Sequence, residues 1–337
     1  MAIGGTTPKD SFVYGTNESK RDDLPQLRGG EFLTDCGLET TTFQEQDDTY
    51  HDAAFMLLRT RSGRQWLKRY YRSHVNAALS TDSGFILETP TLRAHPDWAW
   101  DFDVSTTELD AINSAAVELA RSIADEFATQ PVTLVTSGCI GSRHDDRATQ
   151  PNMTIVEAME YHGRQVAAFA HARADMITAT AMAQCDEAVG IVRAARVVGI
   201  PVAVSFNVGG DGRLPTGRSL GDAITTVDAA TGSAPVYYIV RCEHPNDAAR
   251  ALDTQAEWVR RVRGLSVVSS SRAEEEVSEL VRRQGRSLLQ HHSWINVLGG
   301  CTTSARIEQT AKACAVAAHA MSTESAPRPW SNHSWVD

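Results

Sequence analysis

The chain has 337 residues, of which 42% are hydrophobic and 22% charged, so it is long enough for one large domain or two smaller ones. Its formal net charge is −10. Because polyanion binding depends on clustered lysine and arginine, this charge argues against nucleic acid as a partner. With no apolar run of 18 or more residues, we also expect no membrane partner.

The first 30 residues are polar and lack the apolar region of a secretory signal peptide. We therefore expect a cytoplasmic protein in which residues 1–30 form an N-terminal leader. The six cysteines are far apart, which argues against the disulfide framework of small secreted proteins. We interpret them as free thiols, core residues or metal ligands: Cys36, Cys139, Cys185, Cys242, Cys301 and Cys314.

Eight short apolar runs follow the leader and are typical of strands buried on both faces. They span residues 31–35, 84–88, 132–136, 175–179, 201–206, 236–240, 264–268 and 295–299. Segments with apolar residues at helical spacing lie between and after them. These span residues 64–80, 107–128, 154–172, 184–198, 219–230, 246–261, 273–289 and 304–320.

Eight strand-helix units in about 290 residues are the number needed for a (β/α)8 barrel, the TIM barrel of the α/β class. We predict a single barrel domain over residues 31–322, followed by a tail at 323–337. A doubly wound open sheet remains the alternative, because a strand count does not prove closure. No glycine-rich dinucleotide or nucleotide phosphate motif is present.

In such a barrel the chemistry lies at the carboxyl ends of the strands. Three of the cysteines, Cys36, Cys242 and Cys301, come at or after predicted strand ends. Three thiolates with an open fourth position would suit a catalytic zinc ion. The alternative is that small buried thiols simply fill the barrel mouth.

Several motifs together resemble the homocysteine S-methyltransferase family, whose members methylate a thiol in a zinc-dependent barrel. The resemblance covers residues 32–318. It rests on LTDCGLET, GFILETPTLRAHPDWA, SGCIGSR, YHGRQVAAFAHARADMITA, GRLPTGRSLGDAI, YYIVRCEHP and NVLGGC. It implies transfer of a methyl group from a small, freely diffusing sulfonium or ammonium donor to a homocysteine-like thiol, which zinc would hold as a thiolate.

The resemblance also assigns roles to individual residues. Asp35 would contact homocysteine, Glu88 would be a polar anchor, and Cys242 and Cys301 would be zinc ligands, with Asp35, Cys242 and Cys301 forming the catalytic set. The expected substrate-binding residues are Asp35, Glu88, Thr91, Thr180, Asn207 and Arg241.

The sequence departs from the family pattern at several positions. Thr302 replaces the second cysteine of a Gly-Gly-Cys-Cys pair, Arg241 replaces a usual asparagine, and Thr180 stands where many members carry a substrate-binding glutamate. Either Cys36 supplies the third zinc ligand, or zinc has been lost and the barrel acts on another small amino-acid-like substrate. A third alternative is a non-catalytic protein that binds a small molecule.

Arg241 has three interpretations of its own. Its charge could stabilise the Cys242 thiolate without metal, bind a substrate carboxylate, or form an ion pair at the barrel surface.

Overall fold

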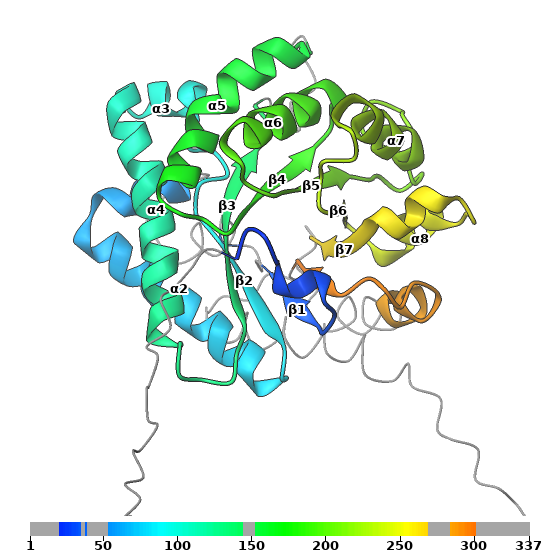
Figure 1. Ribbon diagram of the computed structural model, residues 1–337, viewed down its shortest axis with the longest axis horizontal. Coiled ribbons are helices and arrows are strands. Elements are labelled where there is room, and N and C mark those ends of the chain that lie inside the picture. The colour runs from blue at the N-terminus through cyan, green and yellow to red at the C-terminus, as the bar shows by residue number, and fades with distance from the viewer. Residues whose placement is uncertain (1–19, 35–37, 39–52, 144–151, 269–283, 301–337) are drawn as a thin grey trace, which may run out of the picture.

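The computed structural model describes residues 20–34, 38, 53–143, 152–268 and 284–300. Eight parallel strands form a closed barrel in chain order, and β8 pairs with β1. Figure 1 shows the strands with helices around them. The strands are β1 (Phe32–Leu33), β2 (Gly84–Glu88), β3 (Leu134–Gly141), β4 (Met176–Met182), β5 (Val202–Asn207), β6 (Tyr238–Cys242), β7 (Val262–Val267) and β8 (Val297–Gly299). The predicted (β/α)8 barrel is confirmed, and closure excludes the open sheet.

Helices cover the outside of the barrel, and local capping sets their ends. The α-helices are α2 (Arg61–Ser80), α3 (Pro96–Asp101), α4 (Thr106–Glu126), α5 (Ile155–His171), α6 (Cys185–Val198), α7 (Leu220–Thr231) and α8 (Pro245–Leu252), and residues 284–291 are also helical. The described residues also form three short 3-10 helices, η1 (Pro25–Leu27), η3 (Ala54–Arg59) and η4 (Glu257–Arg261). A capping box of Thr154 and Glu157 begins α5, for example, and Gly199 ends α6 in the left-handed conformation.

Three strands continue by two or more residues beyond their predicted ends at residues 136, 179 and 240. In β3, the additional residues 137–141 pair with residues 176–180 of β4 and are buried. Small residues such as Ser137 and Gly138 continue the strand because their backbones remain in the ladder, although they carry no apolar signal. Thr180, Arg241 and Cys242 therefore lie within strands, and not in the loops that follow them.

The predicted helix over residues 246–261 is divided into α8 and η4. Between them, the N–H of Thr254 donates to the carbonyl of Leu252 at 2.8 Å. The Thr254 hydroxyl then accepts the N–H of Ala256 at 3.3 Å. Local bonds of this kind compete with the helical ladder, which explains the break. The helix predicted for residues 304–320 lies outside the described residues.

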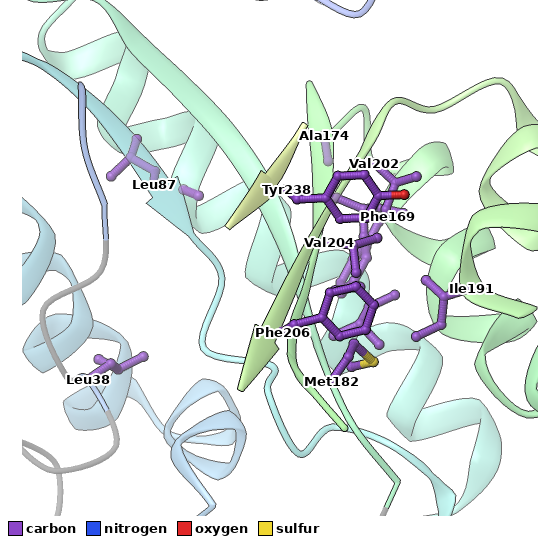
Figure 2. Packing of buried hydrophobic residues seen from close by; sticks show 14 of the residues in the cluster. Leu38, Leu87, Phe169, Ala174, Met182, Ile191, Val202, Val204, Phe206 and Tyr238 are labelled. Atoms are coloured by element: carbon purple, nitrogen blue, oxygen red, sulfur yellow. The ribbon is translucent and has the colours of Figure 1, made fainter. Parts of the chain in front are cut away.

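Alternate residues of each strand face two different cores. Figure 2 shows Val202, Val204 and Phe206 on one side of β5, among the side chains that pack between the barrel and its helices. Ala203, between them, belongs to the core inside the barrel. That inner core consists of Leu24, Phe32, Ile86, Val135, Met176, Ala203, Tyr237, Ile239 and Val297. Once one residue of a strand is assigned to the inner or the outer core, alternation gives the direction in which the other residues of that strand point.

The inner core is covered at the amino ends of the strands by the segment that precedes β1. Leu24 joins the inner core, and the fully buried Gln26 amide nitrogen lies 3.1 Å from the Met176 sulfur and 3.4 Å from the Tyr237 hydroxyl. This leaves the carboxyl ends of the strands as the end available for a site. Of the helices that the structure describes, none is long and apolar enough to cross a membrane.

Candidate active site

Four polar side chains line the barrel at the carboxyl ends of the strands, and we call this set the mouth wall. Its members are Glu88, Thr180, Asn207 and Arg241. On β6, Tyr237 and Ile239 belong to the inner core, so alternation turns Arg241 inward as well. All four are partly exposed, whereas the inward residues two positions deeper on the same strands are buried. The deeper residues are Ile86, Thr178, Ser205 and Ile239.

Hydroxyl groups hold the β2 to β4 side of the mouth in place. The Cys139 thiol donates to the Thr180 hydroxyl at 3.7 Å. Thr91 is fully buried, and its hydroxyl donates to the Cys139 carbonyl at 2.8 Å. The Thr89 hydroxyl accepts the N–H of Cys139 at 2.9 Å and lies 2.6 Å from the Thr91 hydroxyl. Thr91 thus supports the mouth wall from behind, by joining the loop after β2 to β3.

Arg241 is the cation of the mouth wall. It is partly buried, and its backbone pairs with Asn207 of β5 and Ser266 of β7. Within the described part of the chain, its guanidinium group forms no ion pair or hydrogen bond. An ion pair of Arg241 at the barrel surface stays a prediction, and alternation on β6 directs the side chain towards the space inside the mouth.

Cys242 ends β6 and is 5% exposed. Its side chain lies on the opposite side of the strand from Arg241, next to the start of α8, where the backbone N–H of Ala248 donates to the sulfur. Burial raises the pKa of the Cys242 thiol to about 12, Asp247 also raises it, and the Ala248 N–H and Arg241 lower it by less. Without a further cation this thiol is protonated at neutral pH, so Arg241 alone does not produce a thiolate.

The model of the homocysteine S-methyltransferase family matches residues 32–314, most of the chain and all eight strands. The chain belongs to this family. Membership identifies it as a methyltransferase enzyme.

Solved structures of the homocysteine methyltransferase MmuM from Escherichia coli are similar to this family member in fold. The oxidised and metallated forms are each 15% identical in sequence, with a TM-score of 0.67, and the match covers 91% of this chain and 100% of theirs. The apo form is 16% identical, with a TM-score of 0.61 and coverage of 89% and 97%. No curated protein sequence matches significantly. At this identity the likeness shows the fold alone.

The described residues hold one of the three expected zinc ligands. Cys242 is a buried thiol beside a helix start and an arginine, and a bound cation would offset the burial that keeps it protonated, so it fits a zinc ligand. In the part of the chain that the structure describes, no group of three or more His, Cys, Asp or Glu side chains could hold a metal ion. Asp35, Cys36, Cys301 and Thr302 lie outside the described residues.

The backbone that leads up to these positions, at Thr34 and at Gly300, is described. The N–H of Thr34 donates to the carbonyl of Leu298 at 2.9 Å, so β1 and β8 leave the barrel side by side. Gly300 follows β8 with a φ of +90°, and a Cβ atom there would overlap the main chain of Val267. Val267 in turn is the register partner of Cys242. The ends of β6, β7 and β8 therefore share one sector of the rim.

A buried carboxylate next to the mouth was not foreseen from the sequence. Glu187, in the first turn of α6, accepts from the Ser142 hydroxyl at 2.6 Å, the Arg143 N–H at 2.7 Å and His162 Nε2 at 3.0 Å. Burial opposes ionisation, yet these bonds hold the pKa of Glu187 below its ordinary value. In the sequence, only the helical spacing of α5 could have pointed to His162, because that spacing places His162 on the same buried side of the helix as Phe169.

A histidine–tyrosine pair lies next to His162, because the Tyr161 ring packs 4.9 Å from the His162 ring. His95, 1% exposed, lies with its Nδ1 2.6 Å from the Tyr161 hydroxyl. The Arg143 guanidinium lies 4.5 Å from the centre of the Tyr161 ring and pairs with Asp97 at 2.7 Å. These contacts join the loops after β2 and β3 to α5 and α6, so the loops that support the mouth are fixed to the outer helices.

Proposed function

We propose that this protein transfers a methyl group from a small sulfonium or ammonium donor to a thiol acceptor bound in the barrel mouth. The acceptor sulfur attacks the methyl carbon; a carbon–sulfur bond forms, and the donor's bond to that methyl breaks. The donor leaves as a neutral thioether or amine, and the acceptor becomes a methyl thioether. Family membership supports the reaction class, and the observation that carries the proposal is Cys242 in the rim sector shared by β6, β7 and β8.

We further propose that Cys242 and Cys301 are zinc ligands and that Cys36 is the third. Zinc, when bound, would keep the acceptor sulfur ionised at neutral pH. An unassisted thiol, with a pKa of roughly 8.5, is mostly protonated at that pH. Cys242 supports this assignment because its sulfur is buried at the rim and receives the Ala248 N–H. Cys301 directly follows Gly300, and Cys36 comes two residues after Thr34.

Metal analysis of protein purified without added zinc tests the proposal. We expect close to one zinc per chain in the wild type. Cys242→Ser, Cys301→Ser and Cys36→Ser should each lower the zinc content to a small fraction, because every substitution removes one of three thiolates. Cys185→Ser is the matched control, since this buried thiol begins α6 in the outer layer and should leave the zinc content unchanged.

Two results would contradict the zinc assignment. Trace zinc in the wild type would favour the metal-free alternative, in which Thr302 marks the loss of the ligand set. Full zinc in Cys36→Ser would refute the third ligand but leave the other two. A screen of sulfonium and betaine donors against homocysteine then decides whether methyl transfer occurs, with the methylated acceptor detected by mass spectrometry.

A further inference from the structure

We propose that the outer surface of α2 binds an acidic helix of a partner protein. This surface consists of five cationic side chains and one amide, and we call it the cationic face: Arg61, Arg64, Gln65, Lys68, Arg69 and Arg72. α2 lies on the outside of the barrel, next to α4 (Figure 1). None of its residues belongs to the mouth wall, so this partner site is independent of the proposed methyl transfer.

The residues of the cationic face repeat at helical spacing. At about 3.6 residues per turn they occupy an arc of about 140°, and they extend about 17 Å along the axis from Arg61 to Arg72. The opposite side of α2 is buried in the core, with Trp66, Tyr70 and Tyr71 as its largest residues. The six side chains of the cationic face together line an open hollow of about 590 Å³. A partner that lies along α2 can therefore contact all of them.

The cationic face has fewer carboxylates beside it than cations within it. The carboxylate of Glu126, on α4, lies 2.7 Å from Arg72 and 3.8 Å from Lys68, so one anion serves two cations. Arg64 donates to the carbonyl of Leu58 at 2.7 Å. The remaining cations form no ion pair within the described part of the chain, and these are Arg61, Arg64 and Arg69. Three guanidinium groups are thus available to an external anion.

The arrangement of these charges opposes the stability of α2. Arg61 and Arg64 lie in the first turn, where the positive end of the helix dipole favours carboxylates, and that turn contains none. Like charges also lie three or four residues apart along the face, as Arg64 and Lys68 do, and such pairs repel each other. The stability of the helix therefore does not account for the cationic face, whereas binding of an anionic partner does.

Charge and symmetry favour an acidic segment of another protein as that partner. The whole chain carries a net charge of −10 even with this face included, so its other surfaces repel an extended polyanion such as nucleic acid or an anionic membrane. In a symmetric pair of copies, two cationic faces would repel each other, and any other contact would be heterologous and would build rings or filaments. A helix with carboxylates three or four residues apart contacts the cationic face alone and matches its spacing.

Binding of a synthetic peptide to the full-length protein tests this assignment. The probe is a fluorescent, alanine-based peptide of about 16 residues, about 24 Å long as a helix, with glutamate at every fourth position. The control peptide has glutamine at those positions. At low ionic strength we expect fluorescence anisotropy to show at least about tenfold tighter binding of the glutamate peptide, and we expect added salt to weaken it.

Two triple variants locate the binding surface. The first replaces the three available arginines of the cationic face by glutamine, and it should weaken binding of the glutamate peptide by about tenfold. These substitutions are Arg61→Gln, Arg64→Gln and Arg69→Gln. The matched control removes the same charge from exposed arginines elsewhere and should bind like the wild type. Its substitutions are Arg193→Gln, Arg196→Gln and Arg213→Gln.

Stability gives a readout that needs no ligand. Arg61→Gln removes a cation from the first turn of α2, so its urea midpoint should be higher than that of the wild type. A lower midpoint would show that Arg61 stabilises the fold, and it would overturn the inference that the cationic face serves binding.

The binding data can overturn the assignment in three ways. Equal weakening in the two triple variants would show that only the overall charge matters. A wild type that does not bind the glutamate peptide would exclude the acidic helix. Tighter binding of a DNA duplex or of phosphatidylserine vesicles, lost in the first triple variant, would replace the protein partner by one of these polyanions. Circular dichroism verifies that each variant is folded.

Discussion

At the scale of single residues, Arg241 and Cys242 are neighbours in sequence that face opposite sides of the barrel wall. Alternation turns the arginine into the mouth and the thiol towards α8. Burial dominates the pKa of the thiol, which is raised to about 12 in spite of the adjacent cation. The adjacent arginine by itself therefore does not make Cys242 a thiolate at neutral pH.

His95 gives a pH prediction at the same scale. Burial lowers the pKa of His95 to about 3, and His162 and Arg143 lower it further, against Asp97 and Glu187. The His95 ring becomes protonated near pH 6.5 in the unfolded chain, but only near pH 3 in the folded protein. The stability that His95 contributes is thus present above pH 6.5 and is lost as the pH falls towards 3, by about 1 kcal/mol for each pH unit.

Urea denaturation between pH 7.5 and 4.5 measures this dependence. His95→Gln should flatten the decline of the free energy of unfolding over this range relative to the wild type. His171→Gln, exposed at the end of α5, is the control and should follow the wild-type curve. An unchanged slope in His95→Gln would refute the assignment of the acid sensitivity to this buried ring.

At the scale of secondary structure, the end of β8 depends on a glycine that lies close to β7. Gly300 has a φ of +90° and approaches β7 so closely that no Cβ atom fits beside Val267. We expect Gly300→Ala to lower the free energy of unfolding by about 2 kcal/mol or more, because left-handed backbone strain and a steric overlap add together. It should also lower the zinc content, since Cys301 follows directly.

Gly217→Ala separates these two effects. Gly217 has a similar φ of +79°, but no atom lies within 4 Å of the position that a Cβ atom would take, so its variant shows backbone strain alone. We expect a loss of about 1 kcal/mol and unchanged zinc. Equal destabilisation of the two variants in chemical denaturation would show that the contact with β7 is unimportant.

At the scale of the whole molecule, the segment before β1 closes the amino end of the barrel. Leu24 is 2% exposed and packs against inner-core residues from several strands. Leu24→Ala should lower the free energy of unfolding by about 2 to 4 kcal/mol, as expected for a large residue removed from a packed core. Leu27→Ala, a partly buried neighbour at the edge of the same core, should cost clearly less in urea denaturation. Equal costs would argue against a closing role for Leu24.

Much of this fold could be predicted from the sequence because apolar runs and helical spacing record burial locally. The extensions of β3, β4 and β6 could not, since residues such as Ser137, Gly138 and Arg241 join a strand through backbone pairing and carry no apolar signal. Likewise, no sequence motif indicated a role for Glu187 or His162. Their importance comes from a contact between two helices that only the folded chain brings together.

The sequence by itself determined the eight strands and the family resemblance, because these depend on residue types and their order. The tertiary structure decided that the barrel is closed, that Glu88 and Arg241 stand on opposite walls, and that Arg241 and Cys242 point apart. The physical reason is that closure and strand alternation fix which side chains share a space, and the neighbours they create lie far apart along the chain.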